Sequence, residues 1–228
     1  MAIIRKYVVK IEEIVNPLPD VFTVSFSSQK KIKYLPGQFL HLALDDYDGI
    51  GQWPESRCFS MQSNPDDELI RITFAAKGSF TNRMATELKA GKEIWLKMPY
   101  GDVFQRGHNT KNCVFIAGGT GLTPFLSLLT SSLFSEYENP FLYAGFKNKS
   151  YNIFGHELET SKSQNGQLEI NTIYQDIDGI LNIEHILHNS LPQSTFFISG
   201  PPVMIKNFKK YLINEGISES KIITDDWE

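Results

Sequence analysis

The chain has 228 residues, of which 41% are hydrophobic and 21% are charged. These values are ordinary for a globular protein with a buried core, and the length predicts one or two domains. The formal net charge of −4 argues against a nucleic-acid-binding protein, which usually presents a basic surface.

The sequence also excludes several kinds of site. No stretch approaches the ~18 apolar residues of a membrane span, and Arg5, Lys6 and Lys10 interrupt the N-terminus, so we expect a cytoplasmic protein without membrane insertion. The two cysteines, Cys58 and Cys113, cannot supply the four thiolates of an iron–sulfur cluster or a disulfide framework. The histidines form neither an HxxxH nor an HExxH motif, so we predict no metal site.

The first ~105 residues carry short runs in which apolar and polar side chains alternate, a pattern typical of antiparallel strands with one buried face. Several such strands indicate a small barrel or sandwich. The clearest runs are 22–26, 40–44, 70–74 and 94–98. One helix is predicted near 82–89, with Ser79 or Thr81 as its cap and Gly91 after its end.

The rest of the chain alternates near-continuous apolar runs with helical segments, which indicates a parallel sheet in an α/β domain. We therefore predict two domains, 1–108 and 109–228. The apolar runs are 113–117, 141–146, 168–174 and 195–199, and the helical segments are 124–133, 182–188 and 204–214.

A glycine-rich turn follows the first apolar run of the second domain. Gly118, Gly119 and Gly121 precede Thr123, which could cap a helix, and Pro124, which suits its first turn. Glycines let a diphosphate approach the backbone, and a helix N-terminus offers N–H groups to an anion. The spacing is neither GxGxxG nor a Walker A motif. A dinucleotide site and a tight turn without a ligand both fit this segment alone.

A second loop, Ser199 to Pro202, follows another apolar run and begins the last helix. Carboxyl ends of parallel strands share one edge of the sheet, so we expect this loop to lie beside the glycine-rich turn. A plain connection between strand and helix is the alternative.

Three segments of the first domain are candidates for a flavin site. Residues 57–63 combine an arginine, an aromatic ring and hydroxyls, which could hold a diphosphate, cover a ring and donate hydrogen bonds. Residues 78–81 begin the predicted helix and suit a phosphate. Residues 36–39 form a turn that enters a strand. An exposed strand, a simple capped helix and a plain turn are the alternatives.

Together and in order, these segments resemble motifs of the ferredoxin–NADP reductase superfamily. The match covers nearly the whole chain and includes a PGQ turn, R-x-[YF]-S-x-x-S, a flavin-phosphate turn, a G-P-x-G segment with Met98 in place of glycine, G-G-T-G-[IL]-T-P, and C-G-P-P-x-M with Ser199 in place of cysteine. The resemblance implies an N-terminal Greek-key β-barrel with one helix that binds FAD. It also implies a C-terminal Rossmann-like domain that binds NADH or NADPH.

The resemblance implies a role for each matching residue. The FAD-binding residues would be Arg57, Cys58, Phe59, Ser60, Ser63, Gly78, Ser79, Phe80 and Thr81. The dinucleotide-binding residues would be Gly118, Gly119, Thr120, Gly121, Thr123, Pro124, Gly200, Pro201, Pro202 and Met204.

Four residues would lie at the reacting rings: Ser60 near flavin N5, Ser199 beside the nicotinamide, and Asp225 and Trp227 in the acid-x-aromatic ending. Trp227 could cover the flavin or flank the nicotinamide, or it could merely pack on the surface. Because a hydroxyl is smaller and less polarizable than a thiol, we expect Ser199 to preserve hydride transfer but to slow it.

The activity implied is hydride transfer from NAD(P)H to flavin N5, with electrons passed to a separate acceptor such as a ferredoxin, a flavodoxin or an oxygenase component. The alternatives are a reductase that releases reduced flavin as a product, and a non-catalytic flavin-binding subunit. Gln175 and Asp176 lie where a 2′-phosphate would need a basic group, which favours NADH, although Lys147 and Lys149 could supply a positive charge.

Overall fold

The computed structural model describes residues 3–225. The chain forms two compact units that meet in sequence at Asp102 and Val103, six residues before the boundary that we predicted. Val103 is buried in the core of the second unit and Phe104 packs against that core, so apolar burial ties this stretch to the second unit. No helix among the described residues is long and apolar enough to cross a membrane.

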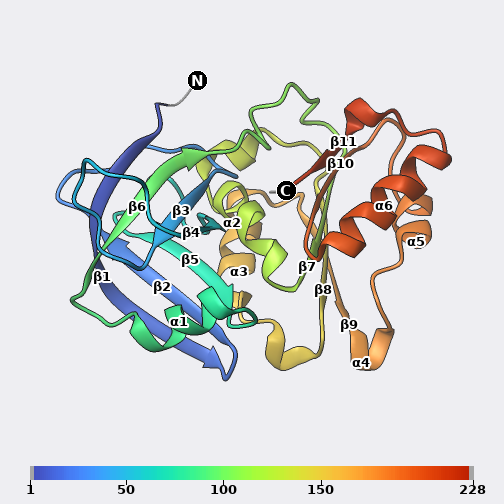
Figure 1. The fold of residues 1–228 in the computed structure, drawn as a ribbon. Helices are drawn as coiled ribbons and strands as arrows, with labels where there is room; N and C mark the ends of the chain where they lie inside the picture. The colour runs from blue at the N-terminus through green and yellow to red at the C-terminus, as the bar shows by residue number, and fades with distance from the viewer. Residues whose placement is uncertain (1–2, 226–228) are drawn as a thin grey trace. The chain divides into compact units, whose positions relative to one another are not determined.

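The first unit is a six-stranded antiparallel sheet with one helix, α1 (Ser79–Glu87) (Figure 1). The strand order is β4-β3-β6-β1-β2-β5. The strands are β1 (Arg5–Leu18), β2 (Val21–Ser27), β3 (Phe39–Ala43), β4 (Ser56–Ser60), β5 (Ile70–Ala75) and β6 (Glu93–Tyr100). The alternating runs of the sequence therefore do form antiparallel strands.

The two edges of this sheet approach each other, as in the predicted barrel. The N–H of Gln62, just after β4, donates to the carbonyl oxygen of Arg71 in β5 at 2.8 Å. The rings of Phe59 and Phe74, from the same two edges, have centroids 6.0 Å apart. The apolar side chains of the strands and of α1 fill the interior.

The second unit is a five-stranded, wholly parallel sheet of order β11-β10-β7-β8-β9. Its strands are β7 (Cys113–Gly118), β8 (Phe141–Phe146), β9 (Glu169–Tyr174), β10 (Thr195–Ser199) and β11 (Ile222–Thr224). The sequence predicted the first four, whereas β11 has three residues and no distinctive apolar run.

Helices cover both faces of this sheet. Alternate residues of its central strand, β7, are apolar on both faces, so each face needs a covering layer. Phe115 packs in one core with α2 and α3, and Ile116 packs in the other with α5 and α6 (Figure 1). The helices are α2 (Thr123–Leu129), α3 (Gly155–Gln164), α4 (Gln175–Asp178), α5 (Ile183–His188) and α6 (Pro202–Asn214).

Two details of α2 differ from the predictions. Thr123 is not the cap: Leu122 holds that position, and the Thr123 hydroxyl instead donates to the carbonyl oxygen of Thr120 at 2.9 Å. The helix also ends at Leu129 rather than Leu133, which is 47% exposed in a separate 3-10 turn. Near this end the hydroxyl of Thr130 donates to a carbonyl of the last turn, a local bond that competes with further helix.

Candidate nucleotide-binding sites

Arg57 and the start of α1 lie together in the first unit. The Arg57 guanidinium carbon is 5.1 Å from the centroid of the Phe80 ring, although 22 residues separate the two in sequence. The guanidinium also pairs with the Glu55 carboxylate at 2.8 Å, and both side chains are about half exposed. An exposed pair of this kind contributes little to stability, so the guanidinium remains available to an anion.

The turn at the start of α1 has the form of an anion cradle. The Thr81 hydroxyl accepts hydrogen bonds from the N–H groups of Lys77 and Gly78, each at 3.0 Å. These hydrogen bonds fix the turn that leads into α1. The helix begins at Ser79, three residues before the start that we predicted. The first N–H groups of a helix have no acceptor within it, and a Cβ at Gly78 would meet no atom within 4 Å. The turn is open and suits a phosphate.

Strand β4 directs its side chains to two faces. Phe59 packs against the barrel core and Met61, just beyond the strand, is fully buried in it. Cys58 points the other way, where its Sγ lies 3.4 Å from Nε2 of His41. Burial raises the pKa of the Cys58 thiol, while burial and then Lys97 lower that of His41, so neutral forms are favoured. Cys58 thus does not share the face of Phe59.

Ser60 and Ser63 have different surroundings. Ser60 ends β4 and is partly exposed. Ser63 is 1% exposed, and its hydroxyl lies 2.7 Å from the Tyr34 hydroxyl and accepts the N–H of Arg71 at 3.0 Å. Through these hydrogen bonds, Ser63 holds the end of β4 against β5 within the barrel.

The PGQ turn and the segment that closes the barrel meet through one side chain. Gln38 is 5% exposed, accepts the N–H of Leu35 at 2.8 Å and donates to the carbonyl oxygen of Gly101 at 3.0 Å. A Cβ at Gly101 would lie 2.9 Å from the Phe39 ring, and its φ is +84°. Both motifs therefore hold the barrel together.

In the second unit, the two predicted loops lie in direct contact. Strands β7 and β10 are adjacent and parallel, with Ala117 opposite Ser199. A Cβ at Gly121 would lie 2.5 Å from the Cα of Gly200, and a Cβ at Gly118 would lie 2.9 Å from the Pro201 ring. Only glycine permits this approach of the two backbones.

The outer part of the glycine-rich turn is open. Gly119 has a φ of +57°, and a Cβ there would meet nothing within 4 Å. A 3-10 turn, Gly119–Leu122, leads directly into α2, where Pro124 lies in the first turn. Thr120 is partly exposed, whereas Thr123 and Pro124 are buried. On the neighbouring loop Pro201 and Pro202 are exposed and Met204 is partly buried. This open turn and helix start suit a diphosphate.

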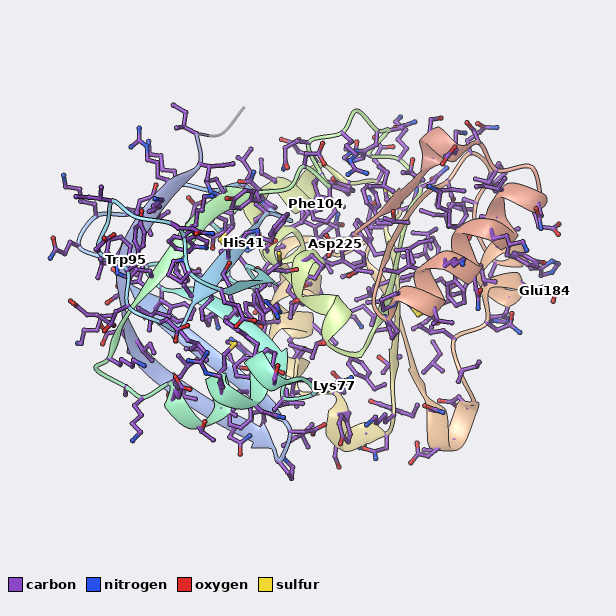
Figure 2. All side chains as sticks on the ribbon, viewed as in Figure 1. His41, Lys77, Trp95, Phe104, Glu184 and Asp225 are labelled. Carbon is purple, nitrogen blue, oxygen red and sulfur yellow. The ribbon has the colours of Figure 1, made fainter. Side chains whose placement is uncertain are left out.

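A serine and an aspartate meet at the carboxyl ends of β10 and β11 (Figure 2 labels Asp225). The Ser199 hydroxyl donates to Oδ2 of Asp225 at 3.2 Å, and the two residues are 3% and 8% exposed. The sequence pointed to both residues but contained no sign of their contact. Trp227, the other predicted residue of this ending, lies outside the described residues.

On the opposite side of the same edge, two carboxylates follow β9, and two lysines, Lys147 and Lys149, follow β8. The Asp178 carboxylate accepts the N–H of Tyr174 at 2.9 Å, and Asp176 is exposed beside it. The Lys147 ammonium lies 4.9 Å from the centroid of the Tyr151 ring. A ribose hydroxyl suits such carboxylates better than a phosphate does.

Comparisons with known proteins agree with this geometry. No family model matches the chain. The chain is 24% identical to flavohemoprotein A of Dictyostelium discoideum over 96% of its own length and 59% of that protein's. It is 26% identical to the naphthalene 1,2-dioxygenase system ferredoxin–NAD(P)(+) reductase component of Pseudomonas putida, over 98% of its length and 68% of that protein's. It thus spans less than two thirds of the Dictyostelium protein.

A solved ferredoxin NADP+ reductase from Neisseria gonorrhoeae with bound FAD and NADP has the same fold. The TM-score is 0.78 at 18% identity, over 96% of this chain and 98% of that one. The relatives and structural neighbours are ferredoxin–NADP reductase-like, so the resemblance and the two-domain fold that we inferred from the motifs are confirmed.

Proposed function

We propose that this chain, whose relatives and structural neighbours are ferredoxin–NADP reductase-like, is an NAD(P)H-dependent flavoprotein reductase. It binds FAD in its first unit and a nicotinamide dinucleotide in its second. One observation carries this proposal: in each unit, segments distant in sequence meet at an open turn that starts a helix. Arg57 lies over Phe80 in the first unit, and Gly200 lies against Gly121 in the second.

A bound flavin supplies the redox chemistry, because it accepts a hydride at N5 and can release electrons singly or together. The protein binds and orients. Arg57 would offset part of the charge of the flavin diphosphate, and the N–H groups at the start of α1 would donate hydrogen bonds to it. Phe59, which is partly buried against the barrel core, would cover the flavin with its exposed part, and Ser60 would donate a hydrogen bond to it. The Gly118–Gly121 turn holds the nicotinamide diphosphate, and no general base is needed.

We propose that the electrons leave to a separate acceptor protein, such as a ferredoxin or an oxygenase component. The similarity to the reductase component of the naphthalene dioxygenase system supports this reading. We also propose a cytoplasmic location. The two free cysteines, Cys58 and Cys113, are compatible with a reducing compartment.

We propose NADH as the preferred donor. Exposed Asp176 and the Asp178 carboxylate would repel the 2′-phosphate of NADPH, and of the two lysines after β8, Lys147 and Lys149, the first lies over the Tyr151 ring. Steady-state assays should give a kcat/KM for NADH at least about tenfold above that for NADPH, since two like charges about 4 Å apart near a protein surface repel by about 4 kcal/mol and a tenfold ratio needs about 1.4 kcal/mol. Equal values, or a preference for NADPH, would contradict this choice.

A visible spectrum of the purified full chain tests the main proposal. We expect about one flavin per chain, bleached by NADH without oxygen. A colourless protein that oxidises NADH only when flavin is added would instead be a flavin reductase. A yellow protein that neither nucleotide bleaches would contradict the enzymatic proposal.

A further inference from the structure

A cavity of about 410 Å³ lies in the second unit, at the end of the sheet opposite to the glycine-rich turn. Phe196, the second residue of β10, lines it, together with the end of α5, the connection 190–194 and the loop after α6. Phe196 lies beside Val114, near the start of the parallel strand β7, whereas the glycine-rich turn follows the end of β7. The cavity and the turn are therefore separated by roughly 13 Å along the strands.

Apolar side chains form one side of the cavity. Phe196 is 1% exposed, and Leu187 and Ile217 pack against the core that contains it. Leu191, which also lines the cavity, is 39% exposed. The hydroxyl of Ser194 donates to the carbonyl oxygen of Leu191 at 2.6 Å, so its proton is already used. The apolar part of a ligand would be shielded from water on this side.

The other side of the cavity carries a positive charge. Lys221 is the only charged side chain among the described residues that line it. Its ammonium donates a hydrogen bond to the amide oxygen of Gln193, a neutral acceptor that does not offset the charge. Glu219, two residues earlier, pairs instead with Lys209 at 2.7 Å. The charge at this cavity therefore suits an anion.

The wall that carries Gln193 is held in place by its own contacts. Gln193 has a φ of +66°, a left-handed conformation that is strained for a residue other than glycine. The side-chain amide of Asn112 donates to the carbonyl oxygen of Pro192 at 3.1 Å, and the N–H of Ser194 donates to that of Leu191 at 3.3 Å. Because these bonds fix the wall, a ligand does not have to order it, which favours binding.

We propose that this cavity binds a small amphipathic carboxylate, with its apolar chain against Phe196 and its carboxylate at Lys221. The volume lies within the range of small-molecule sites, about 300–1,000 Å³. One lysine matches the single charge of a carboxylate, whereas a phosphate dianion would need further donors. The site shares no residue with the turns proposed to hold diphosphates, so this inference does not depend on the proposed function.

Calorimetric titration of the full chain with octanoate, with and without NAD+, tests this site. Acetate carries the same charge without the chain, and octan-1-ol carries the chain without the charge. Wild type should bind octanoate saturably, at least about a hundredfold more tightly than acetate, and equally well with NAD+ present. In Lys221→Gln, affinity for octanoate should fall about tenfold, and affinity for octan-1-ol by no more than about twofold.

A matched control is Lys210→Gln, which removes an exposed lysine from α6 of the same unit and should bind octanoate as wild type does. Leu191→Trp enlarges a side chain of the wall and should weaken octanoate and octan-1-ol alike, by about tenfold.

Three outcomes would overturn the inference: no saturable binding of octanoate by wild type, an affinity that NAD+ lowers, or equal affinities of Lys221→Gln and Lys210→Gln. If Lys221→Gln does not fold, an unchanged affinity for octanoate in Leu191→Trp does the same. Binding of octanoate without any binding of NAD+ would instead contradict the proposed function alone.

Discussion

The guanidinium of Arg57 lies 5.1 Å from the centroid of the Phe80 ring, at the first turn of α1. This contact brings a strand residue and a helix start into one anion site in the first unit. We therefore expect Arg57→Ala to weaken flavin binding by about tenfold to a hundredfold, the loss of one charge-assisted contact.

Flavin release measured by fluorescence after dilution tests this expectation. Lys10→Ala, which removes an exposed cation from β1 of the same unit, is the control and should retain its flavin. Unchanged affinity in Arg57→Ala would exclude the guanidinium from the diphosphate site.

The two glycines of the turn after β7 should respond differently to alanine. At Gly121 the new Cβ would lie 2.5 Å from the Gly200 backbone, so the two loops must separate. We expect a large loss of stability and of NAD+ binding. At Gly119 the Cβ meets nothing, but the φ of +57° makes alanine strained by about 1 kcal/mol.

Thermal unfolding and NAD+ titration of both variants provide the comparison. Gly107→Ala serves as the control, because a Cβ there also meets nothing within 4 Å. Should Gly121→Ala be no more damaging than Gly119→Ala, the contact between the loops would not matter for folding or binding.

Ser199→Cys should raise the rate of flavin reduction by NADH several-fold. A thiol is larger and more polarizable than the hydroxyl, so it fills more of the space beside the ring. Stopped-flow absorbance at the flavin band measures the rate. Ser163→Cys, which adds a thiol at an exposed position of α3, controls for the thiol itself. An equal or slower rate in Ser199→Cys would count against the proposed role of this position.

Burial raises the pKa of the Cys113 thiol from 9.0 to about 12. The folded state thus keeps a proton that the unfolded state releases near pH 9.0. This contribution to stability is complete below that pH and is lost as the pH rises toward 12, at about 1.4 kcal/mol per pH unit. Between pH 8 and 11, the free energy of unfolding measured with urea should fall less steeply with pH for Cys113→Ala than for wild type.

Burial also raises the pKa of the half-buried Cys58, which makes this residue the natural comparison. Cys58→Ala should change the pH dependence of the unfolding free energy less than Cys113→Ala does. Parallel declines for wild type and Cys113→Ala would mean that this thiol ionises in the folded protein as freely as in the unfolded chain.

Local patterns in the sequence were sufficient to predict most of the helices and strands. Alternating runs predicted β2, β3, β5 and β6 but not β1. Asn182, at the start of a predicted helical segment, caps α5 and accepts the N–H of His185 at 3.1 Å. The errors at the starts of two helices arose where short polar side chains bond the local backbone. Thr81 moves the start of α1, and Thr123 bonds Thr120 instead of capping α2.

The sequence by itself determined the two-domain fold and the turns able to hold a diphosphate, because hydrophobic period and glycine spacing are local properties of the chain. The sequence also led us to expect the loop at Ser199 to lie beside the glycine-rich turn, but only the tertiary structure decided which residues touch. The contact of Gly121 with Gly200, and that of Ser199 with Asp225 across 26 residues, depend on the order in which strands join the sheet. That order results from the packing of whole elements, which no short stretch of sequence encodes.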